Sequence, residues 1–199
     1  MRKLIVLIPL IFVLVACGDT SKSDSDTALN SGVDTVKIDS TTVVSAPISK
    51  WTISRDTSAM DDSKSVTIFL KADSILSGPL GYRGELATLV IRCKEHQTDL
   101  YINNGRSAGV EYGLMDEATV KFRLDSDKPV SLIWSESTND QALFAPNPIA
   151  FARGIVNGTT LVYEYTPFNE NPARFIFTLT GMKEPLQEVA STCGWKLTS

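Results

Sequence analysis

The stretch Thr119-Val120-Lys121-Phe122-Arg123-Leu124 alternates polar and apolar side chains. Because successive side chains of a β-strand point to opposite faces, this period of two predicts a strand with one buried face. Segments of similar character occur at 51–55, 66–71, 86–93, 98–103, 130–136, 161–166 and 174–179. Turn-forming residues separate them at 61–63, 103–105, 125–129, 157–158 and 169–172. The sequence therefore predicts a mainly β fold, as an antiparallel β-sandwich or a barrel-like sheet.

Two segments depart from this alternation and predict short helices. Residues 148–156 carry apolar side chains at helical spacing and are followed by Asn157-Gly158, which favours a helix end. Residues 186–193 follow Pro185, a favourable residue in the first turn of a helix. The second helix is expected to return Cys193 to the sheet.

The N-terminal residues predict export and lipid attachment. Arg2 and Lys3 precede an apolar run, 4–15, that is too short to span a bilayer and is typical of a signal peptide. The run ends in Leu14-Val15-Ala16-Cys17, the cleavage pattern of bacterial lipoproteins, in which the cysteine is acylated. We therefore expect removal of residues 1–16 and lipidation of Cys17. The alternative is an ordinary secretory signal with an incidental cysteine.

Gly18, the residue after Cys17, predicts in which membrane the lipoprotein resides. An aspartate at this position would be the usual signal for retention in the inner membrane of Gram-negative envelopes. We therefore expect an outer-membrane lipoprotein that faces the periplasm, held stably by two or more acyl chains.

Residues 17–47 are expected to form a flexible linker between the lipid and a β domain at 48–199. Ser, Thr and Asp fill more than half of the positions from 18 to 47, and no aromatic residue occurs there. Such a composition cannot bury enough apolar surface to offset the entropy of ordering.

Charge and histidine content exclude several classes of partner. The formal net charge of −4 argues against nucleic acid, because an acidic surface repels a phosphate backbone. The single histidine, His96, is next to charged residues and belongs to no cluster with metal-ligand spacing. We expect neither a metal nor a cofactor.

The three cysteines predict one disulfide. If the lipid occupies Cys17, then Cys93 and Cys193 remain, and two thiols in an oxidising compartment usually pair. A redox-active thiol is the alternative, but neither cysteine belongs to a Cys-x-x-Cys motif.

Asp61, Asp62 and Arg92 are candidates for a binding surface. The two carboxylates beside Ser63 could bind a cation, whereas the competing interpretation is a turn capped by Asp61 and Ser63. Arg92 lies on an otherwise apolar strand, and we expect it to pair with Asp61 or Asp62, or alternatively with an acidic partner.

Trp134, Glu136 and Phe144 are further candidates, because they stand in two segments that flank the polar loop 138–141. This aromatic and proline-rich cluster is either the rim of a surface for peptide or glycan, or only the crossover from sheet to helix. An enzyme that uses Glu136 with Asp61 or Asp62 would need two carboxylates in one cleft. No spacing of serine with the single histidine indicates a nucleophile.

Blocks of sequence also resemble a known family. They are 51–54, 58–63, 89–93, 111–113, 134–137, 143–148, 166–169 and 193–195. In this order they resemble the VasI/TagO family of accessory proteins encoded with type VI secretion systems, over residues 50–195. A lipid anchor would be a departure from most members.

The resemblance implies a non-enzymatic envelope protein and supplies no catalytic residues. We expect a lipid-anchored accessory protein that binds an envelope protein of a secretion system. The alternative is a lipoprotein, encoded by a prophage or another locus, that binds peptidoglycan or an envelope protein without a role in secretion.

Overall fold

The computed structural model describes residues 49–77, 86–109 and 116–197. They fall within one compact unit. The expected signal peptide, lipidation at Cys17 and linker lie outside the described residues.

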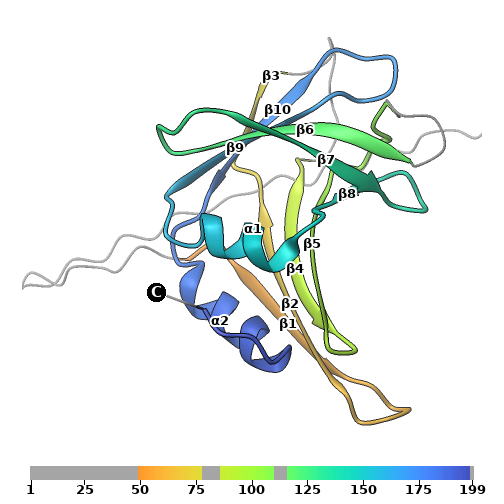
Figure 1. Ribbon diagram of the computed structural model, residues 1–199, viewed down its shortest axis with the longest axis vertical. Helices are drawn as coiled ribbons and strands as arrows, with labels where there is room; N and C mark the ends of the chain where they lie inside the picture. The colour runs from red at the N-terminus through yellow and green to blue at the C-terminus, as the bar shows by residue number, and fades with distance from the viewer. Residues whose placement is uncertain (1–48, 78–85, 110–115, 198–199) are drawn as a thin grey trace, which may run out of the picture. The chain divides into compact units, whose positions relative to one another are not determined.

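Ten strands and two helices occur in the described ranges (Figure 1). The strands are β1 Thr52–Thr57, β2 Lys64–Lys71, β3 Ser74–Ser77, β4 Thr88–Lys94, β5 Gln97–Asn103, β6 Glu117–Leu124, β7 Val130–Glu136, β8 Ala142–Phe144, β9 Thr160–Tyr165 and β10 Ala173–Thr178. The helices are α1 Pro148–Ile155 and α2 Lys183–Thr192. All eight predicted strands and both predicted helices are present, and the short strands β3 and β8 are additional.

The strands form one antiparallel sheet in the order β1-β2-β4-β5-β8-β7-β6-β9-β10-β3. Figure 1 shows β6, β7 and β9 crossing the direction of β2, β4 and β5. Only the three-residue strand β8 pairs with both β5 and β7, and thereby joins the two halves of the sheet.

The sheet bends until its two ends approach each other along a seam. The chain passes from β2 directly to β3 through Ala72 and Asp73, although β3 lies at the far end of the sheet order. The Asp73 N–H donates to the Ile176 carbonyl at 2.7 Å, and Trp51 Nε1 donates to the Leu179 carbonyl at 3.3 Å.

The edge strands β1 and β3 do not pair with each other within the described residues. The prediction of a mainly antiparallel β fold with two short helices is therefore confirmed, and the sheet is strongly bent but is not a closed barrel.

Aromatic side chains fill the inner face of the second half of the sheet. Trp134, Tyr163 and Phe175 are fully buried there. Helix α1 places Phe151 edge-on against Trp134 and Phe122, with ring centroids 5.3 Å and 4.8 Å apart. This geometry favours aromatic pairs beyond the area that they bury.

A disulfide joins α2 to the first half of the sheet. Cys93 on β4 bonds to Cys193, the residue that follows α2, with a Cα–Cα distance of 5.6 Å and a separation of 100 residues. Leu186 and Val189 of the helix are buried in the same core. The predicted pairing is confirmed. The helix begins at Lys183, earlier than expected, so that Pro185 lies inside its first turn.

Candidate binding site

The structure distributes the predicted binding residues over several elements. Trp134 was a candidate for the rim of a binding surface, but its side chain has 0% exposure and lies in the core of the second half of the sheet. That expectation is wrong: the residue is part of the packing, and only its neighbours on β7 reach solvent.

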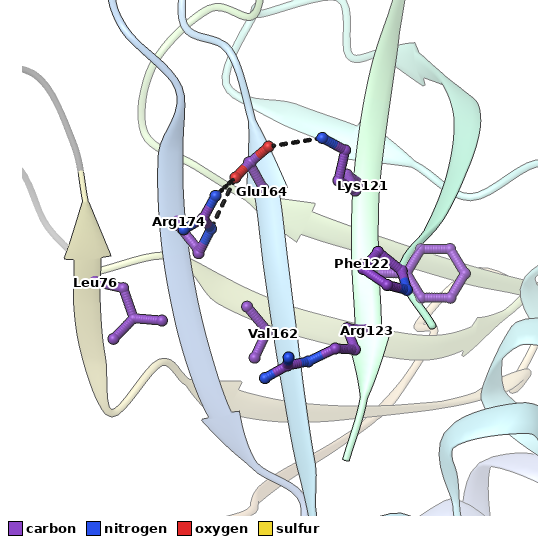
Figure 2. Close-up of a pocket in the computed structure, with 8 residues that line it drawn as sticks. Leu76, Lys121, Phe122, Arg123, Val162, Glu164 and Arg174 are labelled. Atoms are coloured by element: carbon purple, nitrogen blue, oxygen red, sulfur yellow. Dashed lines mark hydrogen bonds and ion pairs between the residues drawn. The ribbon is translucent and has the colours of Figure 1, made fainter. Parts of the chain in front are cut away.

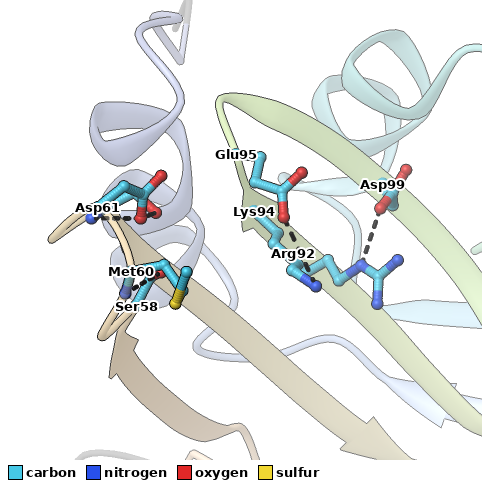
Figure 3. A network of polar contacts seen from close by, with 8 residues as sticks. Ser58, Met60, Asp61, Arg92, Lys94, Glu95 and Asp99 are labelled. Carbon is cyan, nitrogen blue, oxygen red and sulfur yellow. Dashed lines mark hydrogen bonds and ion pairs between the residues drawn. The ribbon is translucent and has the colours of Figure 1, made fainter.

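Asp61 and Asp62 belong to the turn between β1 and β2, and Figure 3 shows Asp61 there. Asp61 Oδ1 accepts hydrogen bonds from the Ser63 hydroxyl at 2.8 Å and from the Ser63 N–H at 3.2 Å. Hydrogen bonds from Ser58 and Ser63 lower the pKa of the Asp61 carboxyl. The carboxylate therefore closes the turn, in agreement with the capping interpretation.

Arg92 pairs with Asp99, and not with Asp61 or Asp62. Its Nε donates to Asp99 Oδ2 at 2.8 Å, from the neighbouring position on β5 (Figure 3). The guanidinium carbon lies 5.4 Å from the centroid of the Tyr101 ring, which stacks on Phe144 at 4.6 Å. The internal ion pair was predicted, but its partner was not, because cross-strand register decides it.

Arg92, Asp99, Tyr101 and Phe144 form a polar and aromatic patch on the outer face of β4, β5 and β8, which we call the outer patch. The Arg92 and Asp99 side chains are about one third exposed. Arg92 and Asp99 thus offset each other's charge within the outer patch, and an ion pair this exposed typically contributes little to stability.

Glu136 has a structural contact. Its Oε1 accepts a hydrogen bond from the Ala108 N–H at 2.5 Å, at a point where Ala108 also bridges to Pro167. Figure 1 shows the turn between β1 and β2 far from the end of β7. The structure therefore does not bring Asp61 or Asp62 together with Glu136.

The other half of β7 is apolar and exposed to solvent. Val130 and Ile133 are each 46% exposed and Leu132 is 38% exposed. β8 pairs with β7 only at Ser135 and Glu136, so the sheet does not continue beside the other half of β7. Large apolar side chains on an uncovered strand are a feature of binding surfaces.

Helix α1 forms the opposite wall of this opening, which we call the β7–α1 groove. It consists of two adjoining pockets of about 290 Å³ and about 250 Å³. Ala150 and Phe151 of α1 line both pockets, Val130 lines the first, and Leu132 lines the second. The first pocket is also lined by Phe122, Leu124, Asp127, Lys128, Gly154 and Ile155, and the second by Ala145, Pro146 and Asn147.

The sequence indicated only one rim of the groove. The segment 143–148, with Phe144 and the two prolines, was a candidate rim for a peptide or glycan, and Pro146 and Asn147 do line the second pocket. Leu132 and Phe151 were missed as site residues. In the sequence, nothing distinguishes an apolar side chain that lines a groove from one that packs in the core.

A separate surface pocket, of about 200 Å³, lies on the outer face of β6, β9, β10 and β3 (Figure 2). Its rim is charged: Glu164 pairs with Arg174 and, at 3.4 Å, with Lys121. Arg123 and Val162 lie beside each other in its floor (Figure 2). Glu164 is the one carboxylate among these lining residues and offsets one of the three positive charges of Lys121, Arg123 and Arg174, so the lining keeps a net positive charge.

The described ranges contain no group of three or more His, Cys, Asp or Glu side chains that could hold a metal ion. Neither of the two helices has the length and apolar character that a membrane-spanning helix requires. Both findings concern only residues 49–77, 86–109 and 116–197.

No protein-family model matches the chain, and no curated protein matches it. Among solved structures, the crystal structure of invasion associated protein B from Bartonella henselae is similar to it at 12% identity, with a TM-score of 0.46. That similarity covers 71% of this chain and 92% of the other. The resemblance to the VasI/TagO family stays a prediction.

Proposed function

We propose that this protein is a lipid-anchored, non-enzymatic binding protein of the bacterial cell envelope, whose β domain docks onto another envelope protein. By resemblance, that partner belongs to a type VI secretion system. The lipid at Cys17 would hold the domain at the outer membrane, on its periplasmic side.

The observation that carries this proposal is the β7–α1 groove. An apolar strand and a helix leave two adjoining pockets open to solvent, and concave apolar sites with few polar groups are typical of binding sites. Val130 and Leu132 are too exposed to contribute fully to the core, so their apolar character is better explained by a partner.

The disulfide supports the proposed compartment. Disulfides form and persist in oxidising environments and are rare in the cytosol. The pairing of Cys93 with Cys193 leaves Cys17 as the cysteine available for acylation, which agrees with the cleavage pattern around it.

In-cell photo-crosslinking tests the function. A photoreactive phenylalanine replaces Leu132 in the groove, and a matched variant carries it at Leu76, a 55% exposed leucine of β3. We expect an adduct with an envelope protein from position 132 that position 76 does not give.

Sedimentation with purified peptidoglycan distinguishes the alternative. Binding to peptidoglycan without a protein adduct at position 132 would contradict docking on a protein and favour the peptidoglycan-binding lipoprotein. If position 132 gives no adduct and the protein does not sediment with peptidoglycan, both functions are contradicted.

A further inference from the structure

We propose that the free edge of β7 receives an extended peptide from a partner protein. The peptide would add as a strand beside Val130–Trp134 and place alternate apolar side chains into the two pockets against α1. This inference deepens the binding function proposed above and rests on it, but it is tested separately.

The backbone of β7 has hydrogen-bonding groups directed at the open edge. In an antiparallel pair, residues alternate between bonding to one neighbour and pointing to the other side. The Glu136 N–H donates to the Asp116 carbonyl on the β6 side, and the Ser137 N–H donates to the Ala142 carbonyl on the β8 side.

This alternation assigns Val130, Leu132 and Trp134 to β6, in agreement with the β6–β7 register. The N–H and C=O groups of Ser131 and Ile133 then point away from β6, beyond the end of β8. Within the described residues these groups have no partner. They are a template for one more strand, which is how sheet edges capture extended peptides.

The side chains of an added strand would meet the pockets. Val130 and Leu132 lie on the inner face of β7, on the same side as buried Trp134, and line the two pockets with Phe151. A peptide in register with β7 has side chains of the same period, so every second residue would enter a pocket. The arrangement of a strand edge beside a helix thus supplies backbone bonds for affinity and pockets for specificity.

The edge lacks the features that normally prevent strand addition. Natural edge strands are blunted by charged residues, prolines or bulges. The sequence Val130-Ser131-Leu132-Ile133-Trp134 contains none of these residues, and its register with β6 is continuous. β8 already pairs at Ser135, so an added strand would continue an existing ladder.

The size of the edge favours a peptide over a second copy of this chain. The free segment, 130–134, is short, whereas a stable interface between folded proteins typically uses about 20–30 residues on each side. An extended peptide needs only the edge and the two pockets.

Hydrogen exchange measured by NMR tests the proposal on the full mature chain with Cys17→Ser and the disulfide intact. The probe is the peptide most enriched from a phage-displayed library of random linear decapeptides. We expect apolar residues at alternate positions of the peptide. At saturation, exchange of the Ser131 and Ile133 amides should slow at least tenfold, while the Leu132 and Trp134 amides, already bonded to β6, should not change.

Two variants separate the edge from the pockets. Ile133→Pro removes one outward N–H, and Ala150→Trp fills both pockets from the helix without changing the edge. Each should lower the affinity for the peptide at least tenfold, while the control Leu76→Lys should leave this affinity unchanged. If Ile133→Pro does not fold, the affinity of Ala150→Trp still tests the role of the pockets, and the exchange data still test the role of the edge.

Three outcomes would overturn the proposal. They are the enrichment of no peptide, a bound peptide that leaves exchange at Ser131 and Ile133 unchanged, and protection of both amides in the free protein, which would mean that the chain or a second copy already covers the edge. A missing adduct in cells would instead contradict the proposed function and leave these measurements intact.

Discussion

Gly158 shows how one backbone position couples the end of α1 to the sheet. A Cβ added there would lie 2.3 Å from Leu124 Cδ1 and 2.8 Å from Leu124 Cγ. The sequence indicated a turn at Asn157-Gly158, but the need for glycine comes from the approach of Leu124, a contact that only the folded chain makes.

We therefore predict that Gly158→Ala destabilises the domain by about 1–3 kcal/mol, the usual cost of overpacking. The leucine must move, because the new methyl group would overlap it. In a Leu124→Ala background the same substitution should cost less, and a double-mutant cycle from urea unfolding measures this coupling. Equal costs in both backgrounds would show that Leu124 is not the obstacle.

Asp73 carries a second residue-scale prediction, on pH dependence. Burial tends to raise the pKa of its carboxyl, but hydrogen bonds from Lys50 and Thr178 and the charge of Lys50 together lower it. Because the pKa is lower in the folded than in the unfolded state, the ionised group stabilises the fold above the unfolded value, and this contribution is lost as the pH falls through the folded value.

Asp73→Asn should therefore reduce the free energy of unfolding at pH 7 by about 1 kcal/mol. The difference from the wild type should shrink below about pH 4, the ordinary range for an aspartate. Urea unfolding of both proteins at several pH values measures it. A difference that stays constant down to pH 3 would mean that the carboxylate charge does not contribute.

At the scale of elements, the disulfide holds α2 on β2 and β4. It closes a loop with a sequence separation of 100 residues. In the chain-entropy model a loop of this length is worth about 4.7 kcal/mol, because the bond restricts the unfolded state.

We predict that the double variant Cys93→Ala/Cys193→Ala loses up to about 4–5 kcal/mol of stability. The wild type under dithiothreitol is the matched control, since it breaks the same bond without a substitution. Urea unfolding measures both. The amides of α2 should also exchange faster, and an unchanged helix would show that Leu186 and Val189 hold it without the bond.

The strands that sequence reasoning found have a clear period, and those that it missed do not. β6 alternates because one of its faces is buried against the core, and that burial leaves a pattern in the sequence. β3 and β8 span only four and three residues, too few to show a period. Local turn chemistry likewise predicted the Asp61–Ser63 turn correctly.

The groove is not predictable in this way. Val130–Glu136 was predicted as a strand and is one, yet nothing in these residues says that β8 ends after two pairs and leaves Ser131 and Ile133 open. That property depends on the order of strands in the sheet, which is set by contacts between segments distant in sequence.

For the whole molecule, the proposed lipid anchor makes a direct prediction. Cys17→Ser should release the protein from membranes into the soluble periplasmic fraction, because the acyl chains supply its attachment. Gly18→Asp should keep the protein in membranes but move it to the inner membrane. Cell fractionation with density-gradient separation measures both, and membrane association of the Cys17→Ser protein would contradict lipidation.

The contacts along the seam would be the first to bear a mechanical force applied at the N-terminal side of the domain. Any tension transmitted from the N-terminal side of Ser49 first meets Lys50, bonded to Asp73, and then Trp51, whose indole is bonded to Leu179. Only after these two contacts yield would β1 begin to peel from β2. The contacts that bring the two ends of the sheet together would thus also resist unfolding by a pulling force.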